Sequence, residues 1–298
     1  MKLNVFIVKG KTLIFVFCSF LIVILTTLLI MKALNISNEA VPTMSKPQFE
    51  EYLKDDLNGD GKADLLYITC KDNTYYMEAH VDNNTYFFNT KNALGQHLSF
   101  WPLSVKLIDL NNDSIPEIIT QSSFEENPIS HTFLWNSNEF KDILHSKTNF
   151  IGVLNSSNKN PVILLSSISD SSTNLYTIKD NELTNIPLDT LSSLILNTIT
   201  TFINNIEESN PLDTLELFSK YISEDEKSNF YNLKNENYKY SFQDCFLEEL
   251  PSPNSSSNEY LVNLNFKRYI DEDFAQVNLT ISLAKIENNL KITSFKIN

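Results

Sequence analysis

Glycine, cysteine and basic residues are scarce in this chain. Only five glycines and three cysteines occur in 298 residues, and Cys18 lies inside a long apolar segment. The two other cysteines are too few for a disulfide framework, which excludes the class of small disulfide-stabilised domains. We expect Cys70 and Cys245 to be separate thiols because the repeat pattern described below places them in different regions.

Patterns that mark a catalytic site are also lacking. The four histidines, at positions 80, 97, 131 and 145, show no H-E-x-x-H or similar metal-binding spacing. An enzyme needs a positioned acid, base or nucleophile, and none reaches the strength of a motif here. The sequence therefore predicts that this protein is not an enzyme.

Negative charge dominates most of the chain. Four of the 23 basic residues lie in the first 34 positions, which hold no acidic residue. The rest has 37 acidic and 19 basic residues, a net charge of −18. A surface this acidic repels phosphate backbones, so we expect no nucleic acid partner. It suits a protein that lives among divalent cations.

A long uncharged segment lies near the N-terminus. Residues 12–31 are apolar or uncharged, and as a helix they would measure ~30 Å, enough to span a bilayer. Lys2, Lys9 and Lys11 precede the segment, and the positive-inside rule then places the N-terminus in the cytoplasm.

This segment sets the expected order of the N-terminal parts. We expect a cytoplasmic tail at 1–11, a transmembrane helix at 12–34, a linker at 35–46 and everything beyond outside the cytoplasm, at the cell membrane. A cleaved signal peptide is the alternative, although its apolar core would normally be shorter.

Two acidic stretches, at 56–64 and 109–117, both read D-x-N-x-D-x-x-x-[D/E], and an apolar β-type run follows each one. Ca²⁺ takes six to eight oxygen ligands, which alternate side chains of a tight loop can supply. An EF-hand or dockerin loop would need an acidic twelfth residue, but Tyr67 and Thr120 stand there. A polar turn that binds nothing is the simpler alternative, and the identical spacing of two stretches argues against it.

The acidic loops belong to a longer repeat. They are 53 residues apart, and a third copy at 153–164 keeps the apolar frame but has Leu154, Ser156 and Val162 in place of the ligands. Each copy shows about four short strands, with hairpin turns at 82–84, 136–138 and 179–182. Four strands in about 45–50 residues is typical of a propeller blade.

The loops resemble the FG-GAP/VCBS repeats of integrin-type β-propellers and of many bacterial surface proteins. The resemblance covers about residues 47–187 and implies two Ca²⁺ sites. The implied ligands are Asp56, Asn58, Asp60, Asp64 and the Lys62 carbonyl in the first loop, and Asp109, Asn111, Asp113, Glu117 and the Ile115 carbonyl in the second. The shortage of glycine and the three copies depart from an ordinary closed propeller.

Residues 188–298 change in character to an α+β pattern. Helical spacing follows a plausible N-cap at Asp189, a second helix is expected from 210 to 222, and a capping box at 223–226 predicts a third. Four long strands are then predicted, at 238–247, 260–269, 275–286 and 290–297.

This order resembles the cone-shaped nuclear-transport-factor-2-like fold, which implies a pocket between helices and sheet. Asp244 and Tyr221 would be the acid and tyrosine of an enzymatic member, but a surface acid and a core tyrosine are the simpler interpretation.

The expected fold class is thus mainly β plus α+β, with a transmembrane helix, three propeller-blade-like repeats and a C-terminal cone-like domain. The expected function is a membrane-anchored, extracytoplasmic calcium-binding interaction or scaffold protein with a protein or cell-surface partner. The alternative is a small-ligand sensor or an enzyme that uses a pocket in the C-terminal domain.

Overall fold

The computed structural model describes residues 49–88, 94–154, 161–168, 172–208, 216–233, 238–250, 258–270, 273–287 and 289–298. The expected tail, membrane segment and linker lie outside these residues. Among the residues that are described, no helix is long and apolar enough to cross a membrane. The expectation of a membrane anchor therefore stays a prediction.

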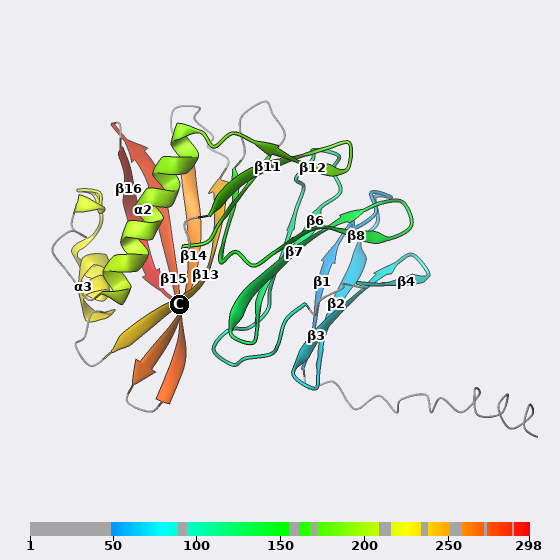
Figure 1. Cartoon of the computed structure of the whole chain (residues 1–298), viewed down its shortest axis with the longest axis horizontal. Helices are drawn as coiled ribbons and strands as arrows, with labels where there is room; N and C mark the ends of the chain where they lie inside the picture. Colours follow the sequence, from blue (N-terminus) through cyan, green and yellow to red (C-terminus); the bar gives the residue numbers. More distant parts are fainter. Residues whose placement is uncertain are drawn as a thin grey trace, which may run out of the picture. The chain divides into compact units, whose positions relative to one another are not determined.

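The first two repeats each form one four-stranded antiparallel sheet (Figure 1). The strands of the first are β1 (Phe49–Asp55), β2 (Asp64–Lys71), β3 (Thr74–Val81) and β4 (Asn84–Phe87). Those of the second are β5 (Ser104–Ile108), β6 (Glu117–Phe124), β7 (Asn127–Trp135) and β8 (Phe140–Ser146). Both sheets keep the sequence order of their strands, which confirms the expected four strands per repeat.

The third repeat has the same four strands in a larger sheet. These are β9 (Phe150–Leu154), β10 (Val162–Ser166), β11 (Thr173–Lys179) and β12 (Glu182–Ile186). The C-terminal strands are β13 (Lys239–Leu250), β14 (Glu259–Ile270), β15 (Asp273–Ile286) and β16 (Asn289–Ile297). A parallel ladder between β9 and β13, from Phe150 opposite Cys245 to Val153 opposite Glu248, joins both groups into one eight-stranded sheet.

Three hydrophobic clusters lie between successive layers. One contains β2 and β3 side chains with Ile118 and Phe133 of the second sheet. Another contains Ile119 of the second sheet with apolar residues of β9, β10 and β11, and with Phe246 of β13. Because Ile118 and Ile119 point to opposite faces, the second sheet is buried on both sides.

The third and largest cluster lies between the eight-stranded sheet and the helices α2 (Thr190–Glu207) and α3 (Glu224–Leu233) (Figure 1). The Asp189 side chain caps α2 by accepting a hydrogen bond from the Ser192 amide at 2.6 Å. Ser223 and Glu226 form the expected capping box of α3. Helices and sheet therefore enclose a packed apolar interior.

The prediction of a second helix is wrong for residues 216–222, the part of it that the structure describes. Phe218 forms a bridge with Ile292, and the Ile292 amide donates to the Leu217 carbonyl at 2.8 Å. The backbone groups that a helix would use are engaged by the edge of β16. Residues 209–215, where that helix was expected to begin, lie outside the described part of the chain.

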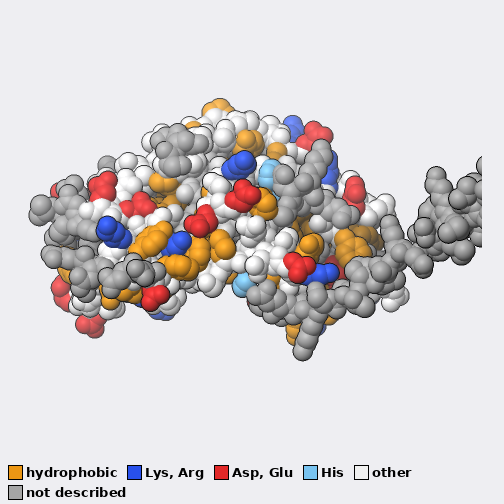
Figure 2. All heavy atoms as spheres, turned by 60° about the horizontal axis from the view of Figure 1, so that its bottom comes forward, with side chains coloured by type: hydrophobic (Ala, Val, Ile, Leu, Met, Phe, Trp, Pro, Cys, Tyr) orange, Lys and Arg blue, Asp and Glu red, His pale blue; other side chains and the backbone are white. Residues whose placement is uncertain are grey.

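The proposed boundary at 187/188 stays a prediction, but the sheet and the largest cluster both cross it. Cys70 and Cys245 are buried in different clusters. On the face drawn in Figure 2, acidic, basic and hydrophobic side chains are interspersed. Charge alone therefore does not mark a docking surface on this face.

Candidate functional site

The two acidic loops occupy the same place in their sheets. The loop at 56–64 joins β1 to β2, and the loop at 109–117 joins β5 to β6. The last residue of each loop already belongs to a strand, since Asp64 pairs with Asp55 and Glu117 pairs with Ile108. The β ladder therefore fixes the ninth position of both loops.

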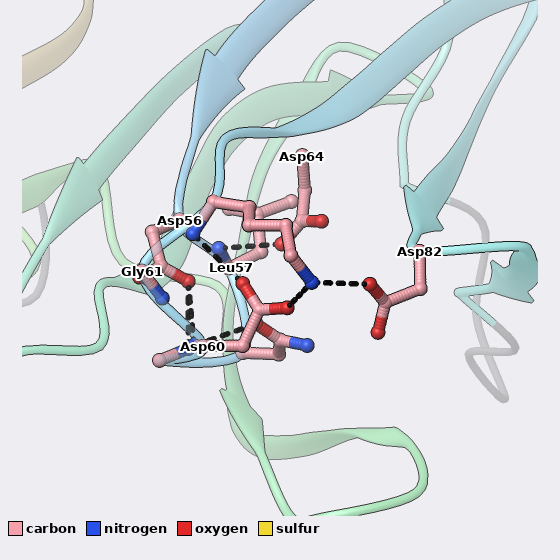
Figure 3. A network of polar contacts seen from close by, with 9 residues as sticks. Asp56, Leu57, Asp60, Gly61, Asp64 and Asp82 are labelled. Carbon is pink, nitrogen blue, oxygen red and sulfur yellow. Dashed lines mark hydrogen bonds and ion pairs between the residues drawn. The ribbon is translucent and has the colours of Figure 1, made fainter.

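In the first loop the Asp56 carboxylate organises the backbone (Figure 3). Its Oδ1 accepts hydrogen bonds from the amides of Gly59 at 2.7 Å and Asp60 at 3.2 Å, and its Oδ2 accepts from the Gly61 amide at 2.8 Å. Asp60 Oδ1 in turn accepts from the Lys62 amide at 2.8 Å. Short acidic side chains of this kind bind nearby amides and so close a tight turn.

The second loop repeats the same hydrogen bonds. Asp109 accepts from the amides of Asn112 at 2.7 Å and Ser114 at 2.9 Å. Asp113 Oδ1 accepts from the Ile115 amide at 2.8 Å, and Asn111 Oδ1 from the Asp113 amide at 2.9 Å. The two loops therefore have one backbone design, although few residues outside the predicted ligands are shared.

The left-handed backbone positions also correspond. In the first loop they are Gly59 at φ 79° and Gly61 at φ 82°. Their equivalents 53 residues later are Asn112 at φ 62° and Ser114 at φ 69°. The second loop therefore places ordinary L-residues where the first uses glycine, which has no Cβ to clash there.

The ninth-position carboxylates are buried. Asp64 is 5% exposed and accepts from the Leu57 amide at 3.0 Å, and Glu117 is 2% exposed and accepts from the Leu110 amide at 2.6 Å. Burial raises the pKa of Asp64, and burial raises the pKa of Glu117 to about 7. Negative charges at the first and fifth loop positions add to both shifts. The three carboxylates of each loop are thus close enough to repel one another.

The loops differ in which group contacts the carboxylate at the fifth loop position. In the first loop Lys62 Nζ contacts Asp60 Oδ2 at 2.7 Å and Asp82 Oδ1 at 3.2 Å (Figure 3). The Lys62 hydrogen bond lowers the pKa of Asp60. In the second loop no lysine takes this place, and Asp113 Oδ2 accepts from Asn111 Nδ2 at 2.9 Å. Asp82 comes from the β3–β4 hairpin, and no loop motif pointed to it.

The donor set fits a hard cation in chemistry, with three carboxylates and one amide oxygen in each loop. In the present arrangement, however, no three His, Cys, Asp or Glu side chains among the described residues converge closely enough to hold a metal ion. In the first loop, the Lys62 ammonium would have to leave Asp60 before that carboxylate could turn inward.

The two loops touch each other. A Cβ on Gly59 would lie 2.8 Å from the Ile115 side chain, so that glycine allows the first loop to pack against the second. For the third copy, Leu154 ends β9 and Val162 begins β10, while Ser156 lies outside the described residues.

The two residues considered for an enzymatic pocket lie apart, and neither fits the simpler interpretation. Tyr221 is 74% exposed rather than in the core. Asp244 is 4% exposed, accepts hydrogen bonds from Trp101 Nε1 and Asn265 Nδ2, and lies on β13 next to Cys245, which faces the helices. Because neighbouring strand residues face opposite ways, Asp244 lies on the sheet face away from the helices.

Comparison with known proteins bears out the resemblance of the loops. Residues 56–120 match the family model of the FG-GAP-like repeat, so this part of the chain, with both acidic loops, is an FG-GAP-like repeat. No curated protein sequence matches the chain.

The solved structures similar to this chain include three lectin structures, each at 9% sequence identity and over 84% of this chain. Two are mutant forms of the Aleuria aurantia lectin, one with alpha-methyl-L-fucoside (76% of that chain, TM-score 0.32) and one with Fucalpha1-6GlcNAc (77%, TM-score 0.33). The third is the fungal lectin from Aleuria aurantia, described as a six-bladed beta-propeller (76%, TM-score 0.32).

Proposed function

We propose that this protein is a membrane-anchored, extracytoplasmic interaction or scaffold protein of the cell surface whose repeats are stiffened by calcium. The observation that supports it most is the duplicated loop network, because two loops with different intervening residues keep carboxylates at the same three positions and the same backbone bonds. The FG-GAP-like repeat across both loops agrees with a binding or scaffold role.

Calcium would be held by the side chains at the first, third, fifth and ninth positions and by the seventh carbonyl of each loop. When bound, the ion would neutralise three neighbouring carboxylates and tie the β1–β2 and β5–β6 connections to their sheets. Stiff loops at neighbouring ends of two sheets would present a fixed surface to a protein or cell-surface partner.

Calorimetric titration of the full-length chain with CaCl₂ tests the calcium proposal. We expect two binding events, one after Asp60→Ala or Asp113→Ala, and none in the double variant. Glu139→Ala, at an exposed acid in the β7–β8 hairpin, is the matched control and should keep both events. Unchanged heats in the double variant would show that the loops are only turns.

The anchoring proposal needs its own experiment. The lysines before residue 12 predict that protease added outside intact cells digests everything beyond Lys32. A protected full-length chain would overturn this topology. A mature N-terminus near Asn35 in the medium would instead show that the segment is a cleaved signal.

A further inference from the structure

A cavity of ≈ 300 Å³ lies between β5 of the second sheet and the face of β13, β14 and β15 that points away from the helices. Three of its lining residues stand in one row across three neighbouring strands. Asp244 pairs with Asn265, and Asn265 pairs with Asn278. Side chains paired in this way point to the same side of a sheet, so a carboxylate and two carboxamides face the cavity together.

Further amides flank this row, and we name the cavity the amide pocket for them. Asn263 lies two residues before Asn265 on the same face of β14, and Gln276 lies two residues before Asn278 on β15. Gln121 of β6 lines the opposite wall and is held by its Nε2, which donates to the Cys245 carbonyl at 3.1 Å. Each carboxamide has both a donor and an acceptor end.

Several of these groups are held in place by the protein itself. Trp101 Nε1 and Asn265 Nδ2 both donate to Asp244, and Asn263 Oδ1 accepts from Thr280 Oγ1 at 2.9 Å. Asn278 Oδ1 is different, because it lies against protein atoms and accepts no hydrogen bond from another described residue. A buried acceptor without a donor is rare in folded proteins. Because Asn278 lines the cavity, a turn of its carboxamide toward the cavity would let a ligand hydroxyl supply the donor.

The pocket offers little net charge. Among the side chains that line it Lys106 is the one cation and Asp244 the one carboxylate, and Lys106 Nζ lies 5.5 Å from the centre of the Phe246 ring. A strongly charged ligand would therefore find no cluster of opposite charge. An apolar ligand would bury the amides without partners, which is costly.

We infer that the amide pocket binds a neutral carbohydrate of one or two sugar rings. A sugar hydroxyl donates one hydrogen bond and accepts others, so adjacent hydroxyls match carboxamides that donate at one end and accept at the other. The volume lies at the small end of the range for ligand pockets, about 300–1,000 Å³, which limits the ligand to one or two rings. This inference does not depend on calcium, because the pocket contains no residue of the acidic loops.

The test is saturation-transfer NMR on the full-length chain in a polyoxyethylene-ether detergent, which contains no sugar. The probes are cellobiose and N,N′-diacetylchitobiose, with glucose and glucuronate as a pair that differs only at C6, where a carboxylate replaces the hydroxymethyl group. We expect saturable binding of at least one neutral disaccharide, and no tighter binding of glucuronate than of glucose.

Asn278→Ala separates a ligand role from a structural one. It removes the unsatisfied acceptor, so the variant should keep or raise its melting temperature while it binds the disaccharide about tenfold more weakly, as for one lost hydrogen bond. Asn185→Ala, at an exposed asparagine of β12 outside the pocket, is the matched control and should bind normally.

Three outcomes would overturn the inference. One is that no neutral sugar binds saturably at millimolar concentration. Another is binding that is unchanged in Asn278→Ala. The last is that the neutral peptide trialanine amide competes with the disaccharide at equal concentration, which would assign the pocket to peptide backbone instead.

Discussion

The second and third repeats have the same four strands in the same order, but their first strands meet different surroundings. Residues of β5 are all partly exposed, because β5 is an edge strand that pairs only with β6. Residues of β9 are all buried, because β9 pairs with β10 on one side and β13 on the other.

The sequences match this difference. Strand β5 reads Ser-Val-Lys-Leu-Ile, with a lysine that suits an edge, and β9 reads Phe-Ile-Gly-Val-Leu, without a polar residue. Lysine on an edge strand discourages pairing with another chain. One repeat unit can therefore end a sheet or continue it, according to what its first strand exposes.

The largest expected effect comes from removing the third repeat, and with it β9, from the eight-stranded sheet. A fragment of residues 188–298 loses Phe150, Leu164 and Leu175 from the cluster under the helices and leaves the β13 edge open. A fragment of residues 147–298 keeps them. We expect cooperative urea unfolding of the longer fragment and a much lower midpoint, or no cooperative transition, for the shorter one. Equal midpoints would show that the C-terminal domain does not need the third repeat.

Single substitutions at equivalent strand positions give the next effect. Phe150 is fully buried, and Phe150→Ala should lower the free energy of unfolding by about 3–5 kcal/mol through a cavity in the core. Ser104 is the first residue of β5, and Ser104→Ala should change the free energy of unfolding by less than about 0.5 kcal/mol. Chemical denaturation of both full-length variants measures the difference. Similar losses would contradict the contrast between edge and interior strand.

Two carboxylates of the C-terminal part should respond to pH in opposite ways. Burial raises the pKa of Asp244 to about 6 from an ordinary 3.8, so the folded state takes up a proton between these values. Stability should then fall as pH rises through this window, by roughly 3 kcal/mol at most. Denaturation midpoints between pH 4 and 6 measure it, and Asp244→Asn should make this part of the curve less steep, while the raised pKa of Glu117 keeps a part of the fall.

Glu226 is the opposite case. The Ser223 hydroxyl, which donates at 2.6 Å, is the largest cause that lowers the pKa of Glu226 to about 2, and bonds from Ser294 and the Phe295 amide add to it. The stability that ionised Glu226 contributes to the fold is present above the ordinary pKa of 4.5 and is lost as pH falls toward 2. Glu226→Gln should remove this acid-side loss and leave the fall between pH 4 and 6 unchanged.

The smallest effect compares the two acidic loops. Nothing lies within 4 Å of a Cβ placed on Gly61, so Gly61→Ser tests only the left-handed backbone and should cost about 1 kcal/mol. Ser114→Gly, at the equivalent site, should gain at most about that amount. Calorimetric melting of both variants checks the pair. If Gly61→Ser costs nothing, the backbone equivalence of the loops is wrong.

Much of the fold was predictable because its signals are local. The ligand spacing located both loops, the alternating strands located each sheet, and the turn at Asp180 and Asn181 has the left-handed backbone that such residues favour. The hairpin at Glu125 and Glu126 was missed because glutamate is not a typical turn residue, although both adopt positive φ.

Other features depend on contacts that are distant in sequence. The β9–β13 ladder joins strands about ninety residues apart, and no periodicity identifies such a partner. The bridge from Phe218 to Ile292 replaced an expected helix for the same reason, since tertiary pairing overrides local preference. Asp244 looked like a surface acid because its partner, Trp101, lies 143 residues earlier, in the repeat region.

The hydrogen bond from Trp101 to Asp244 also makes Trp101 an intrinsic fluorescent reporter. The chain has two tryptophans, and Trp135 packs against Tyr86 and Phe140, at centroid distances of 5.0 and 4.9 Å. Only Trp101 has its indole N–H on the carboxylate that lines the amide pocket. In a Trp135→Phe background, the remaining tryptophan fluorescence would come from Trp101 alone. Protonation of Asp244 or binding of a sugar would then change its emission wavelength and intensity without any added label.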